Sequence, residues 1–148
     1  MPGSSAIPTL RTNLQTQLEA RAGLTEVTIT RHRPAGDDID GLEHIWFGAA
    51  SGAVSPGSVG SREDVVDLEI RIRVSRPGGD EDASDAAEDR ALALYAELEA
   101  QLVTDPTVDG ACLTWNEMDY ESDVIPGENE QICNLDITIR FETELANS

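Results

Sequence analysis

The chain has 148 residues, of which 39% are apolar and 4% aromatic, and its 29 acidic and 10 basic residues give a formal charge of −19. That length is typical of one domain with one hydrophobic core. All ten basic residues are arginine, which excludes a P-loop lysine, a Schiff-base lysine and a lysine general base, and the acidity argues against a protein that holds nucleic acid.

The N-terminal segment predicts an amphipathic helix over about residues 6–22. Its apolar residues recur at helical spacing, and Gly23 follows the last of them. These residues are Ile7, Leu10, Leu14 and Leu18. The start of the chain has no basic stretch followed by an apolar run, and no window approaches the ~20 apolar residues of a membrane span. We therefore expect a soluble, unexported protein that does not enter a membrane.

Two strands are expected next, at residues 27–33 and 44–50. The first alternates apolar and polar side chains, and the second, HIWFGAA, is the part of the chain richest in aromatic residues. The segment 54–64, VSPGSVGSRED, follows the second strand. Its density of proline, glycine and serine predicts an exposed loop.

Alternation is clearest in the strand expected at residues 65–74, VVDLEIRIRV. Leu68, Ile70, Ile72 and Val74 share one face, whereas Glu69, Arg71 and Arg73 share the other. One face therefore meets a core, and the other meets water or a partner. A helix is expected at about 82–103, because acidic residues crowd its first turns, where the helix dipole favours them, and an apolar stripe follows.

The segment 102–115, LVTDPTVDGACLTW, separates this helix from two closing strands. Pro106 disfavours helix at Asp105, and Gly110 frees the backbone to turn into the next strand. We interpret Asp105 and Asp109 as turn residues whose side chains satisfy nearby N–H groups without a metal.

The two closing strands differ in regularity. In the first, the apolar residues change parity between Trp115 and Met118, which predicts a bulge near residues 116–117. The last strand, at residues 132–141, alternates strictly. Between them the segment 121–131, ESDVIPGENEQ, is expected to be a second exposed loop.

The expected order of elements is α-β-β-β-α-β-β. It predicts an α+β fold in which two helices pack on one face of a mostly antiparallel β-sheet, in a single domain spanning residues 1–148. Cys112 and Cys133 are expected in strands as buried thiols rather than as a disulfide, because the chain shows no secretion signal.

The sequence contains no recognisable catalytic, cofactor or metal site. The acidic run at Asp37, Asp38 and Asp40 lacks the ligand spacing of an EF-hand, and the run that starts at Asp80 lacks its glycine and its glutamate. The two histidines and two cysteines do not have the spacing of a zinc finger. Neither a G-x-S-x-G elbow nor a G-x-G-x-x-G motif occurs. We expect a protein that is not an enzyme.

The remaining candidate for a functional site is the surface of the protein. We expect a partner or subunit contact through arginines on the sheet face that points away from the core and through apolar residues in the two loops. An ordinary solvated face is the alternative for the arginines. The expected contact residues are Val54, Val59, Arg62, Arg71, Arg73, Arg76, Val124, Ile125 and Arg140.

The order of elements and the segment after the long helix together resemble a protein family. A leucine, an Asp-Pro-Thr-like turn and a glycine that leads into the penultimate strand are typical of the tail terminator (tail completion) proteins of long-tailed bacteriophages and related viruses. Leu102, Asp105, Pro106, Thr107 and Gly110 stand at these places here. Asp109 stands where a glycine is common in that family.

The resemblance implies a non-enzymatic structural protein of the virion. Such a protein forms a ring, usually of six copies, that caps the tail tube, ends tube polymerisation and joins the tail to the neck or connector protein. It is assembled in the host cytoplasm and stays at the head–tail junction. Six copies of −19 give −114, so DNA passing through a channel lined by part of this charge would be repelled and would slide without specific binding.

Other interpretations stay open. The chain could be a different head–tail neck component, such as a connector or a stopper. It could also be a small acidic protein-binding domain, an antitoxin-like partner whose acidity mimics nucleic acid. An enzyme would require a concave pocket around His32 or His44 with a perturbed carboxylate nearby.

Overall fold

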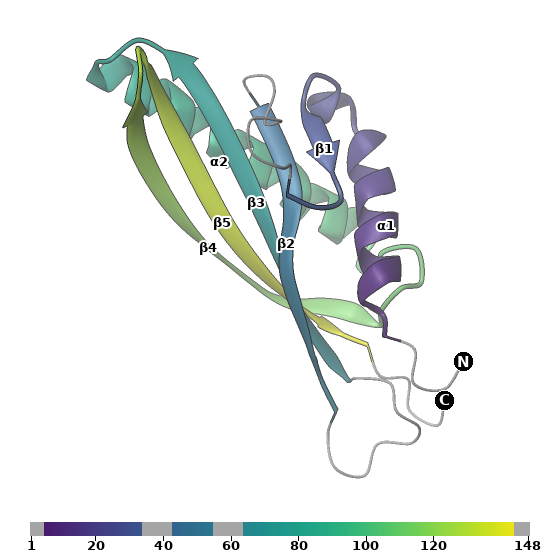
Figure 1. Cartoon of the computed structure of the whole chain (residues 1–148). Coiled ribbons are helices and arrows are strands. Elements are labelled where there is room, and N and C mark those ends of the chain that lie inside the picture. Colours follow the sequence, from purple (N-terminus) through teal and green to yellow (C-terminus); the bar gives the residue numbers. More distant parts are fainter. Residues whose placement is uncertain (1–4, 34–42, 55–63, 144–148) are drawn as a thin grey trace.

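The computed structural model describes residues 5–33, 43–54 and 64–143, and Figure 1 shows the arrangement of the elements. Within these ranges, helices and strands follow one another as expected, which confirms the α+β class and the order α-β-β-β-α-β-β. The elements are α1 (Ile7–Glu19), the short 3-10 helix η1 (Ala22–Leu24), β1 (Thr28–Thr30), β2 (Glu43–Ala53), β3 (Val65–Pro77), α2 (Glu81–Thr104), β4 (Thr114–Gly127) and β5 (Glu130–Glu142).

The strands form one sheet in the order β1-β2-β3-β5-β4. β1 pairs with β2 in parallel, and the other neighbouring pairs are antiparallel, so the sheet is mostly antiparallel as expected. The two outermost strands differ in length, since β1 has 3 residues and β4 has 14. Among the described strands, β4 therefore presents a long unpaired edge along one side of the sheet (Figure 1).

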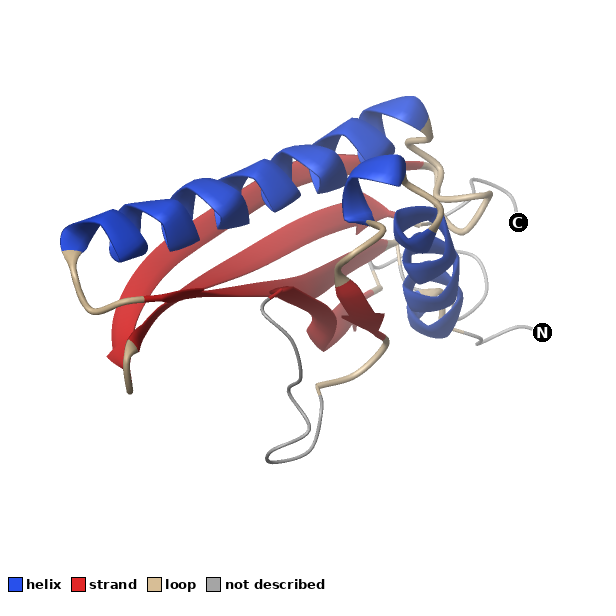
Figure 2. Cartoon of the chain, turned by 90° about the horizontal axis from the view of Figure 1, so that it is seen from above, coloured by secondary structure: helices blue, strands red, loops and turns tan. Residues whose placement is uncertain are grey.

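Both helices cover the same face of the sheet (Figure 2). α2 packs on β3 and β5, and α1 packs beside β1 and β2. The buried stripe of α2 changes from alanine in its first half to leucine in its second. It consists of Ala83, Ala87, Ala91, Leu94, Leu98 and Leu102. These residues meet the alternate apolar residues of β3 and β5, so one core lies between the helices and the sheet.

The structure corrects the expected loop at 121–131. β4 continues through Gly127 and β5 begins at Glu130, so the segment is the end of a β-hairpin with two residues between the strands. Asn129 has a φ of 59°, the left-handed conformation that short hairpin turns favour. The proline, glycine and charged residues of this segment are typical of a loop. Hydrogen bonds to β5 nevertheless stabilise it as a strand, because the context of a strand outweighs its composition.

Other boundaries shift less. α1 ends at Glu19, before residue 22, and β1 is confined to Thr28–Thr30 rather than 27–33. The register of β4 against β5 shifts between Trp115 and Glu117, which confirms the expected bulge.

A turn held by one aspartate joins α2 to β4. The carboxylate of Asp105 accepts hydrogen bonds from the backbone N–H of Asp109 at 2.8 Å and of Thr107 at 3.2 Å, and from Gln17 of α1 at 2.8 Å. Two of these bonds satisfy N–H groups of the turn, as expected for Asp105. The hydrogen bond from the backbone N–H of Asp109, followed by one from the hydroxyl of Thr107 at 2.9 Å, lowers the pKa of the Asp105 carboxyl.

Asp109 contributes to this turn through its backbone. Val108, Asp109 and Gly110 have successive φ values of 50°, 53° and 79°, so the chain reverses through three left-handed residues. In the described part of the chain the side chain of Asp109 makes no hydrogen bond, which corrects the expected side-chain role. A left-handed backbone is the conformation that glycine adopts most easily, and aspartate is among the residues that tolerate it.

Both cysteines are free and buried, as expected. Cys133 lies in β5, but Cys112 lies in the turn just before β4 rather than in a strand. Burial, together with the nearby charge of Asp105, raises the pKa of the Cys112 thiol to about 12. Burial also raises the pKa of Cys133, so the two thiols stay protonated at neutral pH.

Candidate interaction surface

The sheet face that points away from the helices is polar, and we call it the open face. Alternate residues of β3, β5 and β4 build it in facing rows. β3 contributes Asp67, Glu69, Arg71 and Arg73, β5 contributes Arg140, Thr138, Asp136 and Asn134, and β4 contributes Glu117, Asp119, Glu121 and Asp123. His44 and Trp46 of β2 face the same way, beside Arg73 and Arg71.

β4 contributes four acids in succession to the open face. Glu117, Asp119, Glu121 and Asp123 alternate with residues that point to the helix side, and we call these four the acidic stripe. All four are exposed. Among the described residues, none of them forms an ion pair. Alternate residues of a strand are about 7 Å apart, so four negative charges stand in a row roughly 20 Å long.

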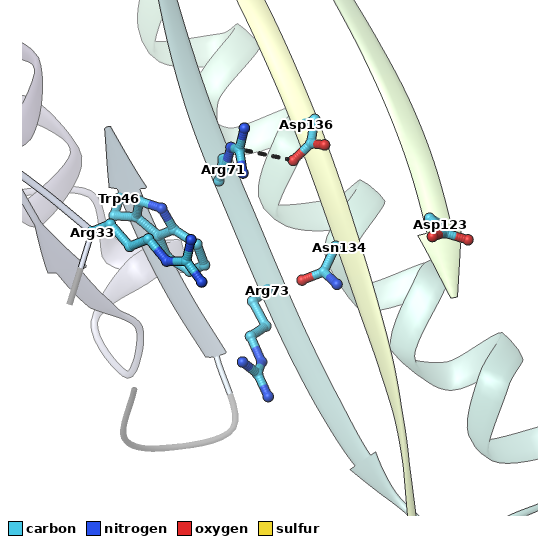
Figure 3. Close-up of a pocket in the computed structure, with 7 residues that line it drawn as sticks. All are labelled: Arg33, Trp46, Arg71, Arg73, Asp123, Asn134 and Asp136. Carbon is cyan, nitrogen blue, oxygen red and sulfur yellow. Dashed lines mark ion pairs between the residues drawn. The ribbon is translucent and has the colours of Figure 1, made fainter. Parts of the chain in front are cut away.

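A hollow of about 260 Å³ crosses the open face (Figure 3). Its lining residues are Arg33, Trp46, Arg71, Arg73, Asp123, Asn134 and Asp136. Arginines and the tryptophan line it on the side of β2 and β3, whereas Asp123 lines it from β4 (Figure 3). The hollow therefore has a positive side and a negative side.

The arginines of the open face are neutralised unequally. Arg71 lies 3.5 Å from Asp136 and 3.8 Å from Glu69. Arg140 pairs with Asp67 at 2.9 Å. Within residues 5–33, 43–54 and 64–143, neither Arg33 nor Arg73 has an ion-pair partner.

Of the expected contact residues, Arg71, Arg73 and Arg140 lie on the open face. Arg76 turns to the helix side and donates to Glu43 at 2.6 Å. Arg90 of α2 donates to the same carboxylate at 2.8 Å and 3.0 Å. Arg76 therefore takes part in a network that ties β2, β3 and α2 together.

The apolar contact residues fall in different surroundings. Val54 is exposed just beyond β2, and Ile125 is exposed on the open face next to the acidic stripe. Val124 points to the opposite side, where it is half-buried against the core. Val59 and Arg62 lie outside the described residues, as does the rest of the segment 55–63.

The acidic stripe is absent from the contact residues expected from sequence, although a signal for it exists. Its four acids recur at every second position from Glu117 to Asp123, the period of a strand. The loop expected at 121–131 ends that strand before Glu121, so the strand predicted from sequence contains only Glu117 and Asp119 of the stripe.

The helix side of β4 carries a half-exposed aromatic strip. The ring of Tyr120 lies 4.7 Å from the ring of Tyr95 in α2, measured between centroids. The indole N–H of Trp115 donates to the carbonyl of Leu102 at 3.1 Å. Tyr120 remains 48% exposed, so α2 covers this margin of the sheet only in part.

The described residues bring no three or more His, Cys, Asp or Glu side chains together as metal ligands. Asp80 caps α2 and accepts a hydrogen bond from the backbone N–H of Ala83 at 3.0 Å. Asp37, Asp38 and Asp40 lie outside the described residues. His44 is buried, 3.0 Å from the hydroxyl of Thr30 and edge-on to Trp46.

In the part of the chain that the structure describes, every helix is too short or too polar to cross a membrane. No family model and no curated protein matches the sequence. Among solved structures, a chain of the "virion of native gene transfer agent (GTA) particle" matches with a TM-score of 0.42 and 14% identity. The alignment covers 90% of this chain and 94% of that one. We assign no function from a similarity of that size.

Proposed function

We propose that this chain is a tail terminator, a structural virion protein that forms a ring on the tail tube, ends tube polymerisation and joins the tail to the neck protein at the head–tail junction. The observation that carries the proposal is the turn between α2 and β4 in a chain of this element order. Its residues are those that resemble the family, from Leu102 to Gly110. Asp105 holds the turn together, and Asp109 adopts the backbone of the glycine that is common there.

Two features of the surface support assembly into a ring. A closed ring of identical subunits joins two different patches of each subunit. The open face offers a negative margin on β4 and a positive one beside β2, and the long free edge of β4 adds unpaired backbone groups. We propose six copies, with the tail tube protein and a neck or connector protein as partners.

The charge of the chain suits a passage for DNA. A ring of six would carry −114, from −19 on each copy. We propose that part of this charge faces a central channel, where it keeps DNA from adhering. Reversing acids that face the channel is expected to slow DNA ejection, and ejection at the rate of the native virion would contradict this part of the proposal.

Electron microscopy of the purified protein with its tail tube protein tests the proposal. We expect six-fold rings with a central hole, and tubes that stop growing and carry a cap once the protein is added. An unrelated protein of similar net charge is the control and should leave tube growth unchanged. Tubes that grow to the same length with and without the protein would contradict a terminator role.

The acidic stripe favours one other candidate, a small acidic domain that binds a basic protein. Such a domain would be a monomer or dimer, would capture its partner in a salt-sensitive way and would not affect tube growth. A connector or stopper would bind neck proteins but would also leave tube growth unaffected. The tube assay therefore separates the terminator from both.

A further inference from the structure

We infer that two copies of this chain meet through the open face, with the acidic stripe of one copy on the arginine patch of the other. The arginine patch is Arg33, Arg71 and Arg73, on the positive side of the hollow. The inference rests on the proposed function in one respect, because a ring needs a contact between unlike patches.

Among the described residues, Arg33 and Arg73 on one margin and the acidic stripe on the other have no ion-pair partner. Arg73, Asn134 and Asp123 form one row across β3, β5 and β4, so a neutral amide separates the arginine from the aspartate. Neighbouring strands are about 4.8 Å apart, which places β3 and β4 roughly 10 Å apart. In a ring, the neighbouring copy on one side can supply Arg73 with a carboxylate, and the copy on the other side can supply Asp123 with a guanidinium.

The spacing of the two patches also matches. Acids of the stripe follow one another at every second residue of β4, and Arg71 and Arg73 do so on β3. Both sets therefore repeat at about 7 Å. When β4 of one copy lies along β3 of another, two successive acids can meet two successive arginines.

Like charges exclude the simplest alternative contact between copies. If β4 of one copy paired with β4 of another, the two acidic stripes would stand side by side on one face. Facing like charges destabilise strand pairs, and charged edge strands resist edge-to-edge pairing. The stripe therefore directs the second copy away from β4 and toward the arginines.

The arginine side of the hollow has the composition of a protein contact. Arg33, Arg71 and Arg73 line it together with Trp46, which is 5% exposed. Arginine is enriched at interfaces, where a few such residues contribute most of the binding energy. In a chain with 29 acids and 10 arginines, the stripe of another copy is a ready partner for this patch.

Charge reversal tests the contact. The stripe variant carries Glu121→Arg and Asp123→Arg, and the patch variant carries Arg33→Glu and Arg73→Glu. These residues have no ion-pair partner among the described residues, so each variant is expected to fold, as circular dichroism would verify. In sedimentation at low salt, we expect each variant to self-associate at least about tenfold more weakly than the wild type.

Mixing provides the decisive measurement. An equimolar mixture of the two variants is expected to associate like the wild type, because each reversed patch then meets its reversed counterpart. The matched control, Asp89→Arg with Glu99→Arg on the exposed side of α2, changes the net charge as the stripe variant does. It should neither weaken self-association nor restore association when mixed with the patch variant.

The outcomes separate this inference from the proposed function. A monomeric wild type, variants that associate like the wild type, or a mixture that fails to recover would each overturn the contact. If the wild type caps tubes but the charge reversals do not change self-association, the terminator role is supported and this contact is contradicted. Association that follows the charges, with no effect on tubes, would support the contact and contradict the terminator role.

Discussion

At the scale of single residues, backbone conformation explains the unusual part of the turn between α2 and β4. Val108, Asp109 and Gly110 all have positive φ, and only the last is a glycine. Val108 is fully buried, so packing holds it in a conformation that β-branched residues rarely adopt. Asp109 is exposed, which leaves its backbone conformation as its contribution to the turn.

Substitution of Asp109 tests this explanation. Asp109→Val is expected to lower the free energy of unfolding by about 1–2 kcal/mol, because a β-branched residue is strained in the left-handed region. Asp109→Gly is the matched control and should change it by no more than about 0.5 kcal/mol. Urea denaturation measures both. An equal loss in the two variants would mean that the carboxylate, not the backbone, stabilises the turn.

The charge of Glu43 ties β2 to β3 and α2 through two arginines. Its side chain is 12% exposed and accepts hydrogen bonds from Arg90 and Arg76. Burial, the largest single influence, raises the pKa of Glu43, but the hydrogen bonds and charges of the two arginines together outweigh it and leave the pKa below its ordinary 4.5. A lowered pKa stabilises the folded state above pH 4.5, and this stabilisation is lost as the pH falls through the folded-state pKa.

Glu43→Gln is therefore expected to destabilise the protein by about 1.5–3 kcal/mol at neutral pH, the usual range for hydrogen bonds to a charged group. The difference from the wild type should shrink as the pH falls below 4.5. Urea denaturation across this pH range measures it, with Glu99→Gln on the exposed side of α2 as the control. A difference that stays constant with pH would contradict the role of the ionised carboxylate.

At the scale of elements, α2 and β4 each combine two roles. α2 covers β3 and β5 with a stripe that runs from alanine to leucine, and its exposed side is acidic near its start. β4 is an edge strand with aromatic residues on one side and four acids on the other. Because strand residues alternate between faces, one edge strand can complete the core and still present a charged stripe.

Ala87 tests how closely α2 packs. It is fully buried, so Ala87→Leu is expected to destabilise the protein by about 1–3 kcal/mol through overpacking. Ala93→Leu, on the exposed side of the same helix, should stay within about 0.5 kcal/mol of the wild type. Thermal denaturation of the two variants measures the difference. Equal stability would show that the sheet leaves room beside the first half of α2.

At the scale of the whole molecule, charge opposes folding. A net charge of −19 on 148 residues repels itself in the compact state. Six ion pairs are found among the described residues, so most of the 29 acids have no cationic partner there. Salt should therefore weaken the repulsion among the acidic residues more than it weakens the attraction within the ion pairs.

We expect the melting temperature of the monomer to rise by a few degrees between about 0.05 M and about 0.5 M NaCl at pH 7, because the screening length falls several-fold. The measurement is thermal denaturation at a protein concentration at which the chain sediments as a monomer. The same series near the isoelectric point of 4.1 is the control and should show a smaller rise. An equal rise at both pH values would assign the effect to something other than repulsion.

Hydrophobic patterning is sufficient to predict the fold class, the order of elements, the two faces of β3 and the bulge in β4. These features depend on which residues are apolar at a period of 2 or 3.6, and burial of one face is a local property of a strand or helix. For the same reason, alternation alone placed Arg71, Arg73 and Arg140 on the face away from the core.

Which residues become neighbours depends on how the strands and helices pack together. Pairing with β5 turned the expected loop at 121–131 into a hairpin and completed the acidic stripe. Because β5 lies between β3 and β4, the residue between Arg73 and Asp123 is Asn134 and not a carboxylate. The direction of Arg76 toward Glu43 depends on β2, β3 and α2 meeting at one point. Register and strand order arise from contacts between residues far apart in the chain, and no local pattern specifies them.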